Sequence, residues 1–284
     1  MLARVTEKPD LADKIIPEFP PNCRRPTPGP GYLEALSKPN VDLIQTPIQR
    51  FTERGIVTAD NTERDVDVVI CATGANIDFA PPFPVISNGV NLNLAWKPGG
   101  VYGYPYMYLG MSTPGFPNIF WIGGPYSTSP SGTVPNSFEN QITYIAKVLR
   151  KVRGQGIQTI IPSFRATEDF IEYCDRFYSR TVWTGNDDDS RERENCRSWY
   201  TGGVPGGRVH AIFPGSSAHA NYVRRDPRWE DYEYTYVNRS GNRFAYLGNG
   251  WTSREMHGNA DLTPHLKLPE DVDLRSWCEG WWDV

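Results

Sequence analysis

The 284-residue chain can form one large domain or two smaller ones and can bury a sizeable core. Its formal net charge of -4 comes from mixed charges along the sequence, without the basic stripe that marks nucleic-acid-binding proteins. A transmembrane helix needs about 18 consecutive apolar residues, and no segment of this sequence approaches that length. We therefore expect neither a nucleic-acid partner nor a membrane span.

The five cysteines show no recognisable pairing pattern. They lie at positions 23, 71, 174, 196 and 278, and no two of them are spaced as Cys-x-x-Cys. Such scatter indicates neither a disulfide framework nor a zinc site, so we expect no metal centre. Because no apolar signal sequence follows Met1, we expect a cytoplasmic protein in a reducing compartment.

The first part of the chain is predicted to be loop-rich, with short strands. The first forty residues are rich in Pro and Gly, with one short helix expected at Tyr32–Ser37. Three strands are expected next, at Val41–Ile44, Ile48–Phe51 and Gly55–Thr58, of which the last two form a hairpin. The β-branched run Asp67–Gly74 ends in small residues, and it predicts a buried parallel strand that leads into a ligand-facing loop.

The second part of the chain carries a further strand and two amphipathic helices. Asn118–Ile122 predicts a buried strand, which a loop of Gly, Pro and Ser residues follows. Pro135–Arg153 and Arg165–Thr181 place apolar side chains on one helical face, and the first of these helices ends in a basic turn. Beyond Trp183 the chain is rich in turns and aromatic residues. These elements together predict an α/β fold.

Ala72-Thr73-Gly74, at the end of the predicted strand, is a candidate ligand site. Small residues at the carboxyl end of a strand let a ligand approach the backbone, and α/β sheets bind their ligands at this edge. An ordinary strand followed by a turn explains the same residues equally well.

Phe116–Pro125, with the helix N-terminus that follows it, is a second candidate. A helix N-terminus offers unpaired N–H donors and a partial positive charge, which suit the anionic edge of a reduced flavin. A plain strand–loop–helix connection is again an equal alternative.

The adjacent arginines Arg24 and Arg25 are a third candidate, because two guanidinium groups beside a Pro/Gly-rich loop can bind a phosphate and an oxyanion. Such pairs are more often simply solvated. Complete nucleotide-binding signatures are missing from the sequence. Gly154-Gln155-Gly156 follows a basic helix and lacks the third glycine of a dinucleotide loop.

These motifs, in this order, resemble class B flavin-dependent monooxygenases. In that family a hydrophobic strand ending in Ala-Thr-Gly connects the NADP domain to the FAD domain, and Asp67–Gly74 matches it. A later Phe-Pro-Asn strand and loop is matched by Phe116–Pro125. The Baeyer–Villiger branch also has a basic–Arg pair ahead of a Tyr-containing helix, which Arg24-Arg25 and Tyr32–Leu36 match.

The later part of the chain resembles the fungal subgroup from secondary-metabolite pathways, the sterigmatocystin and aflatoxin type. The matching stretches are Arg180–Trp183, Cys196–Tyr200, Phe213–Ser216, Arg228–Tyr234 and Asn242–Gly250. The resemblance runs from about residue 11 to residue 252. No stretch of the sequence matches the FAD loop, the NADP loop or the fingerprint that precede the arginine pair in the family.

The resemblance implies a fold, a domain division and an activity. The fold is the C-terminal part of a flavoprotein with two Rossmann-like dinucleotide-binding domains, incomplete at the N-terminus. Residues 1–64 would be the tail of the NADP-binding domain with a linker, and residues 65–284 the C-terminal part of the FAD-binding domain with an aromatic-rich extension. The implied reaction uses FAD, NADPH and O2 to convert a small-molecule ketone into an ester or lactone. The alternative is an inert fragment, or one half of a split enzyme that needs a missing N-terminal half.

The resemblance also assigns roles to individual residues. Arg25 would be catalytic and would stabilise the negative charge that develops during oxygenation, while Arg24 would contact the 2′-phosphate of NADP. Trp199 would close over NADP and substrate, with a packing role in the core as an equal alternative. The residues expected to contact FAD are Ala72, Thr73, Gly74, Gly124, Pro125, Thr133, Val134 and Asn136.

Overall fold

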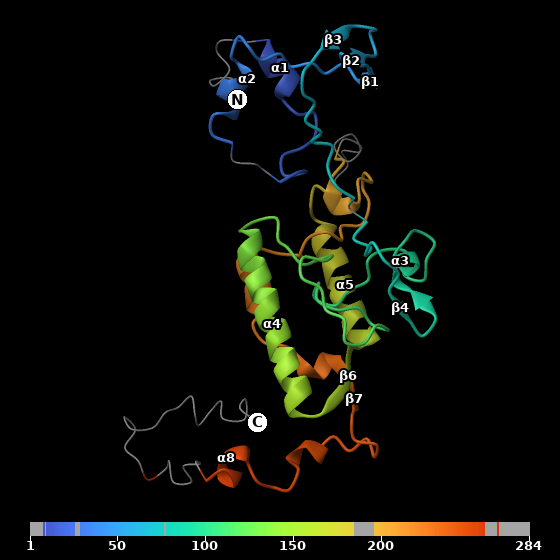
Figure 1. The fold of residues 1–284 in the computed structure, drawn as a ribbon, viewed down its shortest axis with the longest axis vertical. Coiled ribbons are helices and arrows are strands. Elements are labelled where there is room, and N and C mark those ends of the chain that lie inside the picture. Colours follow the sequence, from blue (N-terminus) through green and yellow to red (C-terminus); the bar gives the residue numbers. More distant parts are fainter. Residues whose placement is uncertain are drawn as a thin grey trace.

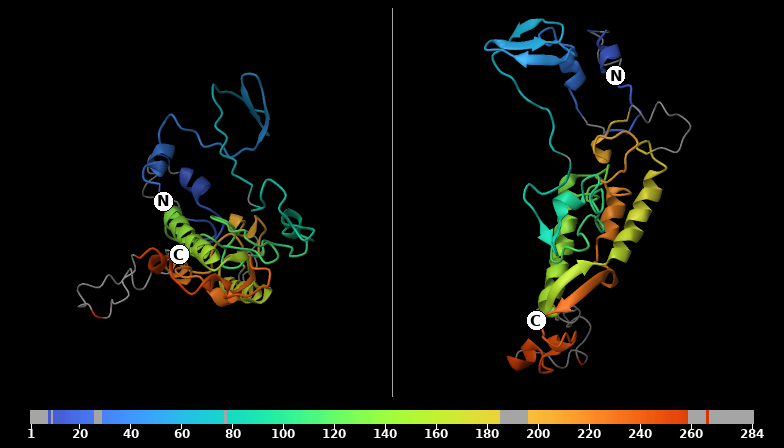
Figure 2. Two further views of the ribbon diagram at one scale, coloured as in Figure 1. Left: turned by 60° about the horizontal axis from the view of Figure 1, so that its bottom comes forward. Right: turned by 90° about the vertical axis from the view of Figure 1, so that its right-hand side faces the viewer.

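The computed structural model describes residues 8, 10–25, 29–76, 78–184, 196–258 and 266. A main body is built around two long helices, and a small N-terminal unit lies beyond one end of it (Figure 1). An extended stretch after the last strand of this unit leads into the main body (Figure 2). Most of the predicted C-terminal extension beyond residue 258, including Cys278, lies outside the described residues.

The N-terminal unit contains short elements only: α1 (Leu11–Ile15), α2 (Tyr32–Leu36), β1 (Ile48–Phe51), β2 (Gly55–Thr58) and β3 (Glu63–Asp65). The three strands form an antiparallel sheet in the order β1-β2-β3. The predicted helix and hairpin are thus confirmed.

The predicted strand Val41–Ile44 is wrong, because this stretch is a loop. Its Leu43 instead packs on a small apolar cluster formed by the two helices. The ammonium group of Lys8 donates to the carbonyl of Val41 at 2.7 Å, which takes up a group that a neighbouring strand would otherwise bind.

The main body holds the remaining elements. They are β4 (Ile86–Ser87), β5 (Val90–Asn91), α3 (Leu92–Ala95), α4 (Val134–Gly154), β6 (Ile157–Pro162), α5 (Phe164–Tyr178), η2 (Trp199–Thr201), α7 (Ser217–Val223), η3 (Trp229–Asp231), β7 (Tyr232–Tyr236), η4 (Ala245–Leu247) and α8 (Ser253–Met256). Strands β6 and β7 pair antiparallel, with Ile160 opposite Tyr234. They lie at the end of α4 and α5 that is remote from the N-terminal unit (Figure 1).

Both long helices form where the sequence predicts them. In α5 the Ser163 hydroxyl accepts a hydrogen bond from the Ala166 amide at 3.1 Å, which caps the N-terminus. The buried face of α4 agrees with the expected apolar face only in part: Val148 is buried and Ile145 and Val152 pack against the core, while Ile142 and Leu149 are exposed. The rest of the buried face carries Ser137, Gln141 and Tyr144. Polar side chains are buried here because they hold the backbone of a neighbouring loop, as described below.

The predicted strand Asn118–Ile122 is wrong, because this stretch forms a turn followed by a loop. Asn118 adopts a left-handed backbone with φ 62°. Its amide donates to the carbonyl of Ile160 at 3.0 Å, and its side-chain oxygen accepts from the Ile160 amide at 3.0 Å. One residue thus makes both contacts with β6 that a paired strand would make, and the chain then turns away.

The predicted strand Asp67–Gly74 is wrong for this structure, because it has no strand neighbour among the described residues and is exposed along its length. Val68 is 76% exposed and Ile70 is 88% exposed. A β-branched run is stable as a buried strand only when neighbouring strands take up its backbone groups and cover its side chains. The described part of this chain offers no such neighbour.

The expectation that the cysteines are unpaired is also corrected. Cys23 and Cys196 form a disulfide with their Cα atoms 5.6 Å apart, across 173 residues of sequence. Both residues are buried in the large apolar cluster of the main body. Cys71 and Cys174 are free.

Candidate functional site

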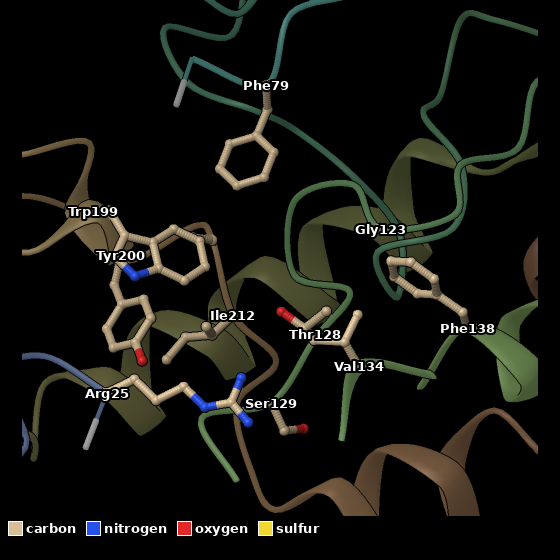
Figure 3. A pocket seen from close by; sticks show the side chains of 11 residues that line it. Arg25, Phe79, Gly123, Thr128, Ser129, Val134, Phe138, Trp199, Tyr200 and Ile212 are labelled. Carbon is tan, nitrogen blue, oxygen red and sulfur yellow. The ribbon is translucent and has the colours of Figure 1, made fainter. Parts of the chain in front are cut away.

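A cavity of about 190 Å³ lies where the N-terminal segment, the loop before α4 and the segment after η2 meet (Figure 3). Three of the predicted site residues, Arg25, Val134 and Trp199, line it. Its other lining residues are Phe79, Gly123, Thr128, Ser129, Phe138, Tyr200, Ala211 and Ile212. The structure thus brings together side chains from Arg25 to Ile212, which are 187 positions apart in the sequence (212 minus 25).

Three backbone segments are hydrogen-bonded side by side to form one wall of the cavity. The Tyr126 amide donates to the carbonyl of His210 at 2.8 Å, and the Phe213 amide donates to the carbonyl of Thr128 at 2.6 Å. On the other side, the His210 amide donates to the carbonyl of Tyr200 at 3.0 Å. These contacts fix the relative positions of cavity residues that lie on either side of α4 and α5 in the sequence.

Arg224 holds the loop before α4 from below. Its fully buried guanidinium donates to the carbonyls of Leu109, Tyr126 and Ser127 at 2.9, 2.6 and 2.6 Å. Within the described part of the chain no carboxylate pairs with it, and burial lowers the pKa of Arg224 to about 10. Arg224 therefore remains charged at neutral pH and turns these carbonyls inward, away from solvent.

Gln141, which is buried on α4, holds the same loop from the other side. Its side-chain oxygen accepts from the Gly123 amide at 2.9 Å, and its NH2 group donates to the carbonyl of Ser127 at 3.2 Å. The Ser137 hydroxyl donates to that carbonyl as well, at 3.1 Å. The loop that leads into α4 is therefore preorganised by buried polar side chains, none of which the sequence analysis had identified.

The two predicted arginines have different surroundings. The guanidinium of Arg25 donates to the carbonyl of Gly132 at 2.6 Å and points toward Ser129 in the cavity (Figure 3). Arg24 lies outside the cavity, donates to the carbonyl of Arg197 at 3.3 Å, and places its guanidinium 4.6 Å from the ring centre of Phe19. Both arginines are exposed, and each has donors left for an anion.

Aromatic side chains form the wall opposite the loop. The rings of Trp199 and Tyr200 lie 4.7 Å apart between their centres and are tilted by 56°. Trp199 is 40% exposed, whereas Tyr200 is buried. Burial raises the pKa of the Tyr200 hydroxyl, and the positive charge of Arg25 opposes that shift. Trp199 is thus a surface residue at the cavity edge and not a core tryptophan.

The predicted flavin contacts are only partly brought together. At the N-terminus of α4, Val134 lines the cavity, whereas Thr133 and Asn136 are exposed outside it. Thr133 makes no side-chain capping bond, and Asn136 accepts a hydrogen bond from Asn221 of α7 at 2.6 Å. Gly124 and Pro125 are buried just behind the lining residue Gly123.

Ala72, Thr73 and Gly74 lie outside the cavity and are exposed. Gly74 has φ 95°, and a Cβ atom added to it would meet nothing within 4 Å. Phe79, a few residues later, does reach the cavity. No signal in the sequence had marked it.

The cavity residues fit part of a flavin or nicotinamide dinucleotide. The hydroxyl of Ser129 is buried and has no hydrogen-bond partner in the structure, so the wall offers an unused polar group beside a guanidinium. Phe79, Ile212 and Trp199 supply apolar surface for a flat ring. Typical ligand pockets have volumes of about 300 Å³ or more, and this cavity is smaller. The described residues alone therefore do not enclose a whole dinucleotide.

The sequence offered weak signals for some lining residues that were missed. Thr128 and Ser129 belong to the Ser/Pro/Gly loop that was noted before α4, and Ala211 and Ile212 directly precede the Phe213–Ser216 stretch. Among the described residues no group of three metal-ligating side chains occurs. No described helix is both long and apolar enough to cross a membrane.

Comparison with known proteins gives relatives of one kind, although no family model matches the chain. The FAD-binding monooxygenase moxY of Dothistroma septosporum is 36% identical over 95% of this chain and 41% of that protein. The FAD-binding monooxygenase stcW of Emericella nidulans is 36% identical over 96% of this chain and 43% of that protein. A Baeyer-Villiger monooxygenase of Pseudomonas aeruginosa is 29% identical over 73% of this chain and 37% of that protein.

Solved structures that resemble this chain are also monooxygenases. Cyclohexanone monooxygenase from Rhodococcus sp. Phi1 bound to NADP+ matches with a TM-score of 0.66 and 26% identity, covering 83% of this chain and 44% of that one. A steroid monooxygenase bound to NADP shares the fold with a TM-score of 0.63, 23% identity and coverage of 80% and 42%. The resemblance to fungal FAD-binding monooxygenases is confirmed, and the fold is mixed α/β. The chain spans less than half the length of the relatives it matches.

Proposed function

Because the chain matches a portion of fungal FAD-binding monooxygenases, we propose that it forms part of an FAD- and NADPH-dependent monooxygenase that uses O2 to convert a ketone into an ester or lactone. One observation carries the proposal beyond the similarity itself. Arg25, Trp199 and the first turn of α4 come from distant parts of the chain and converge on one cavity with an unpaired buried hydroxyl.

FAD, when bound, supplies the oxygen-activating chemistry that amino-acid side chains lack. In the proposal the Ser129 hydroxyl and the α4 N-terminus at Val134 hold the polar edge of the flavin ring, and Ile212 and Phe79 contact its apolar surface. Arg25 stabilises negative charge at the reacting centre, a role that suits a guanidinium because it stays protonated at any working pH. Its single bond to the Gly132 carbonyl leaves the other donors available for that charge.

Trp199 and Arg24 would hold NADP on the aromatic side of the site. Trp199 is exposed at the cavity edge, so its ring can cover a nicotinamide and its N–H can donate to a ribose hydroxyl. Arg24 is exposed outside the cavity, where it can reach the 2′-phosphate without competing with Arg25. The ketone substrate would lie in the cavity between Arg25 and the aromatic wall.

The proposed division places residues 1–64 in the NADP domain tail and linker, and residues 65–284 in the FAD domain. Two exposed apolar surfaces support a further packing partner, which in the proposal is the segment that carries the glycine-rich dinucleotide loops. One is the stretch Val66–Ile70, and the other is the exposed side of α4 with Ile142 and Leu149. Apolar side chains gathered on a surface mark a place where another polypeptide segment packs. The exposed Ala72–Gly74 also favours a chain that does not bind FAD on its own.

The proposal is tested by the absorbance of the purified protein at about 450 nm, where oxidised flavin absorbs. The chain alone should carry no flavin, and the chain co-expressed with, or fused to, the N-terminal part of a relative such as moxY should carry it. Ester formation from ketone substrates is then measured in the flavin-loaded protein. A fused protein that folds but neither retains FAD nor oxidises NADPH would contradict the proposal.

The two arginines predict different defects in the loaded protein. Arg25→Ala should lower the rate of ester formation by roughly 10²–10³, as when one donor to a developing oxyanion is lost, while flavin reduction by NADPH stays measurable. Arg24→Ala should raise the KM for NADPH and narrow the preference over NADH. Near wild-type kcat in Arg25→Ala would remove its catalytic role.

A further inference from the structure

The disulfide between Cys23 and Cys196 joins two positions that are close in sequence to lining residues of the cavity. Cys23 precedes Arg24 and Arg25, and Cys196 precedes the Trp199–Tyr200 wall by a few positions. The bond therefore links covalently two segments that supply neighbouring parts of the cavity lining, with Arg25 beside Tyr200 (Figure 3). The disulfide therefore restrains the position of the arginine segment relative to the Trp199–Tyr200 segment.

The N-terminal unit has few other anchors on the main body. Its own apolar cluster, around Leu11 and Ala12, is separate from the large cluster. Of the described residues before Phe79, the large cluster includes only Cys23 and the partly buried Phe19. The position of the arginine pair relative to the cavity therefore depends on a short stretch of chain around Cys23.

The noncovalent contacts of this stretch are concentrated on the same side as the disulfide. The indole N–H of Trp183 donates a shared hydrogen bond to the carbonyl oxygens of Asn22 and Cys23, at N–O distances of 3.0 and 3.2 Å. Arg24 donates to the carbonyl of Arg197. The bond from Arg25 to Gly132 is exposed, and such a bond contributes only about 0.5–1.5 kcal/mol. The covalent link is thus the strongest restraint on Arg25.

We propose that Cys23 and Cys196 are a reversible oxidation site, and that their disulfide is a clamp that positions Arg25 against the Trp199–Tyr200 wall. In the dithiol state the stretch around Cys23 separates from that wall and the cavity loses its arginine. The functional consequence rests on the proposed role of Arg25, but the clamp itself does not.

Formation of the clamp is a thiol–disulfide exchange with a small-molecule disulfide such as oxidised glutathione. One cysteine thiolate attacks a sulfur of the small disulfide, and one small thiol leaves. The second cysteine thiolate then attacks the resulting mixed disulfide and releases the second small thiol. Two electrons pass from the protein to the small disulfide, and the two cysteine protons end on the two released thiols.

Thiol counting on the full chain tests whether the bond exists. The clamp uses Cys23 and Cys196, so alkylation of the unreduced, denatured protein should label Cys71 and Cys174 but neither Cys23 nor Cys196, and alkylation after reduction should label all five cysteines. Peptide mapping should find residues 23 and 196 in one cross-linked species. Oxidised glutathione added to the reduced protein should again remove the label from Cys23 and Cys196. Five labelled thiols in unreduced protein, or a cross-link between other positions, would overturn the proposal.

Hydrogen exchange measured by mass spectrometry tests the positioning role. Peptides that cover residues 22–25 and 196–201 should lose protection in Cys23→Ser, in Cys196→Ser and in the reduced wild-type chain, and Cys71→Ser should match wild type because its thiol is free and exposed. The double variant should lose no more protection than either single variant, because each already removes the whole bond. Reduction of the wild-type chain changes no side-chain volume, so it separates a clamp from simple packing and remains informative if the variants do not fold.

Unchanged exchange in the reduced wild-type chain would show that the bond positions nothing, and additive losses in the double variant would show that each sulfur acts through packing alone. Either result would overturn the clamp while leaving the flavin proposal intact. Conversely, absence of flavin absorbance in the fused protein would leave the thiol count and the exchange pattern unaffected. The two proposals therefore fail separately.

Discussion

Residues 66–74 and strand β6 are both short runs rich in β-branched side chains, but one is exposed and the other lies in the main body. Ile157 and Ile160 of β6 are buried, β7 pairs with the strand along its length, and α4 packs against it. Val68 and Ile70 have neither a strand neighbour nor a covering helix among the described residues. A partner segment, and not the run itself, makes the difference between a strand and an exposed loop.

The same contrast separates the cavity wall from the exposed Ala72-Thr73-Gly74 stretch. The loop before α4 has backbone partners on both sides and buried polar side chains beneath it, so its geometry is fixed within this chain. Ala72-Thr73-Gly74 has none of these restraints. The following substitutions compare the two regions.

Arg224→Met should have the largest effect, because it leaves the buried carbonyls of Leu109 and Tyr126 without their donor and removes one of the three donors to the carbonyl of Ser127. We expect a loss of about 3–5 kcal/mol in the free energy of unfolding, since breaking a buried charged network typically costs this much. Urea denaturation followed by circular dichroism measures it. Arg225→Met, at an exposed position on the next residue, should stay within about 0.5 kcal/mol of wild type. Equal losses in the two variants would contradict the assigned role of Arg224.

Ile212→Ala and Ile70→Ala make the same substitution in the two regions. Ile212 is buried in the cavity wall, so we expect a loss of about 2–5 kcal/mol from the cavity that the truncation creates. Ile70 is exposed, and its truncation should change the free energy of unfolding by less than about 0.5 kcal/mol in this chain. Denaturation midpoints of both variants give the comparison. In the chain fused to the N-terminal part of a relative such as moxY, the loss of stability from Ile70→Ala should be larger, and an unchanged loss would argue against a packing partner there.

Ser163→Ala and Thr133→Ala compare the N-termini of the two long helices. The Ser163 hydroxyl caps α5, so its loss should cost about 1 kcal/mol. Thr133 makes no side-chain bond at the start of α4, and its truncation should be close to neutral. Thermal unfolding of the two variants side by side resolves this difference. A larger cost at Thr133 would indicate that its hydroxyl caps α4 in solution.

The pH dependence of stability should show the smallest effect. Burial lowers the pKa of His210 in the folded chain, so the unfolded chain takes up a proton first as the pH falls. The contribution of His210 to stability is therefore complete above about pH 6.5, the ordinary histidine value, and decreases as the pH falls below it. Denaturation midpoints between pH 7.5 and 5 should fall less in His210→Gln than in wild type, while the exposed control His219→Gln should follow wild type. Parallel curves for wild type and His210→Gln would contradict this assignment.

The candidate site could be predicted only in part, and the reason is visible residue by residue. Arg25, Val134 and Trp199 could be named because they belong to motifs that the family resemblance covers. Ser129 and Ile212 line the same cavity, but they reach it through backbone pairing between distant segments. Arg224 lies beneath the loop, on the segment after α7, and nothing in its sequence neighbourhood distinguishes it from the exposed Arg225 beside it.

Local sequence determined the elements whose stabilising contacts are themselves local. The helices α4 and α5 and the β1–β2 hairpin form where the spacing of apolar, capping and turn residues predicts them, because their backbone hydrogen bonds close within a few residues or across one turn. The motif order likewise determined the relationship to FAD-binding monooxygenases, which comparison confirmed.

Tertiary structure alone decided the pairing of β6 with β7, the face of α4 that is buried, the disulfide between Cys23 and Cys196, and the assembly of the cavity. Each of these joins groups that are distant in sequence, so its free energy depends on which segments meet and not on the residues of any one segment. Asp67–Gly74 shows the other side of this rule: a strong strand pattern remains exposed where the described chain provides no partner.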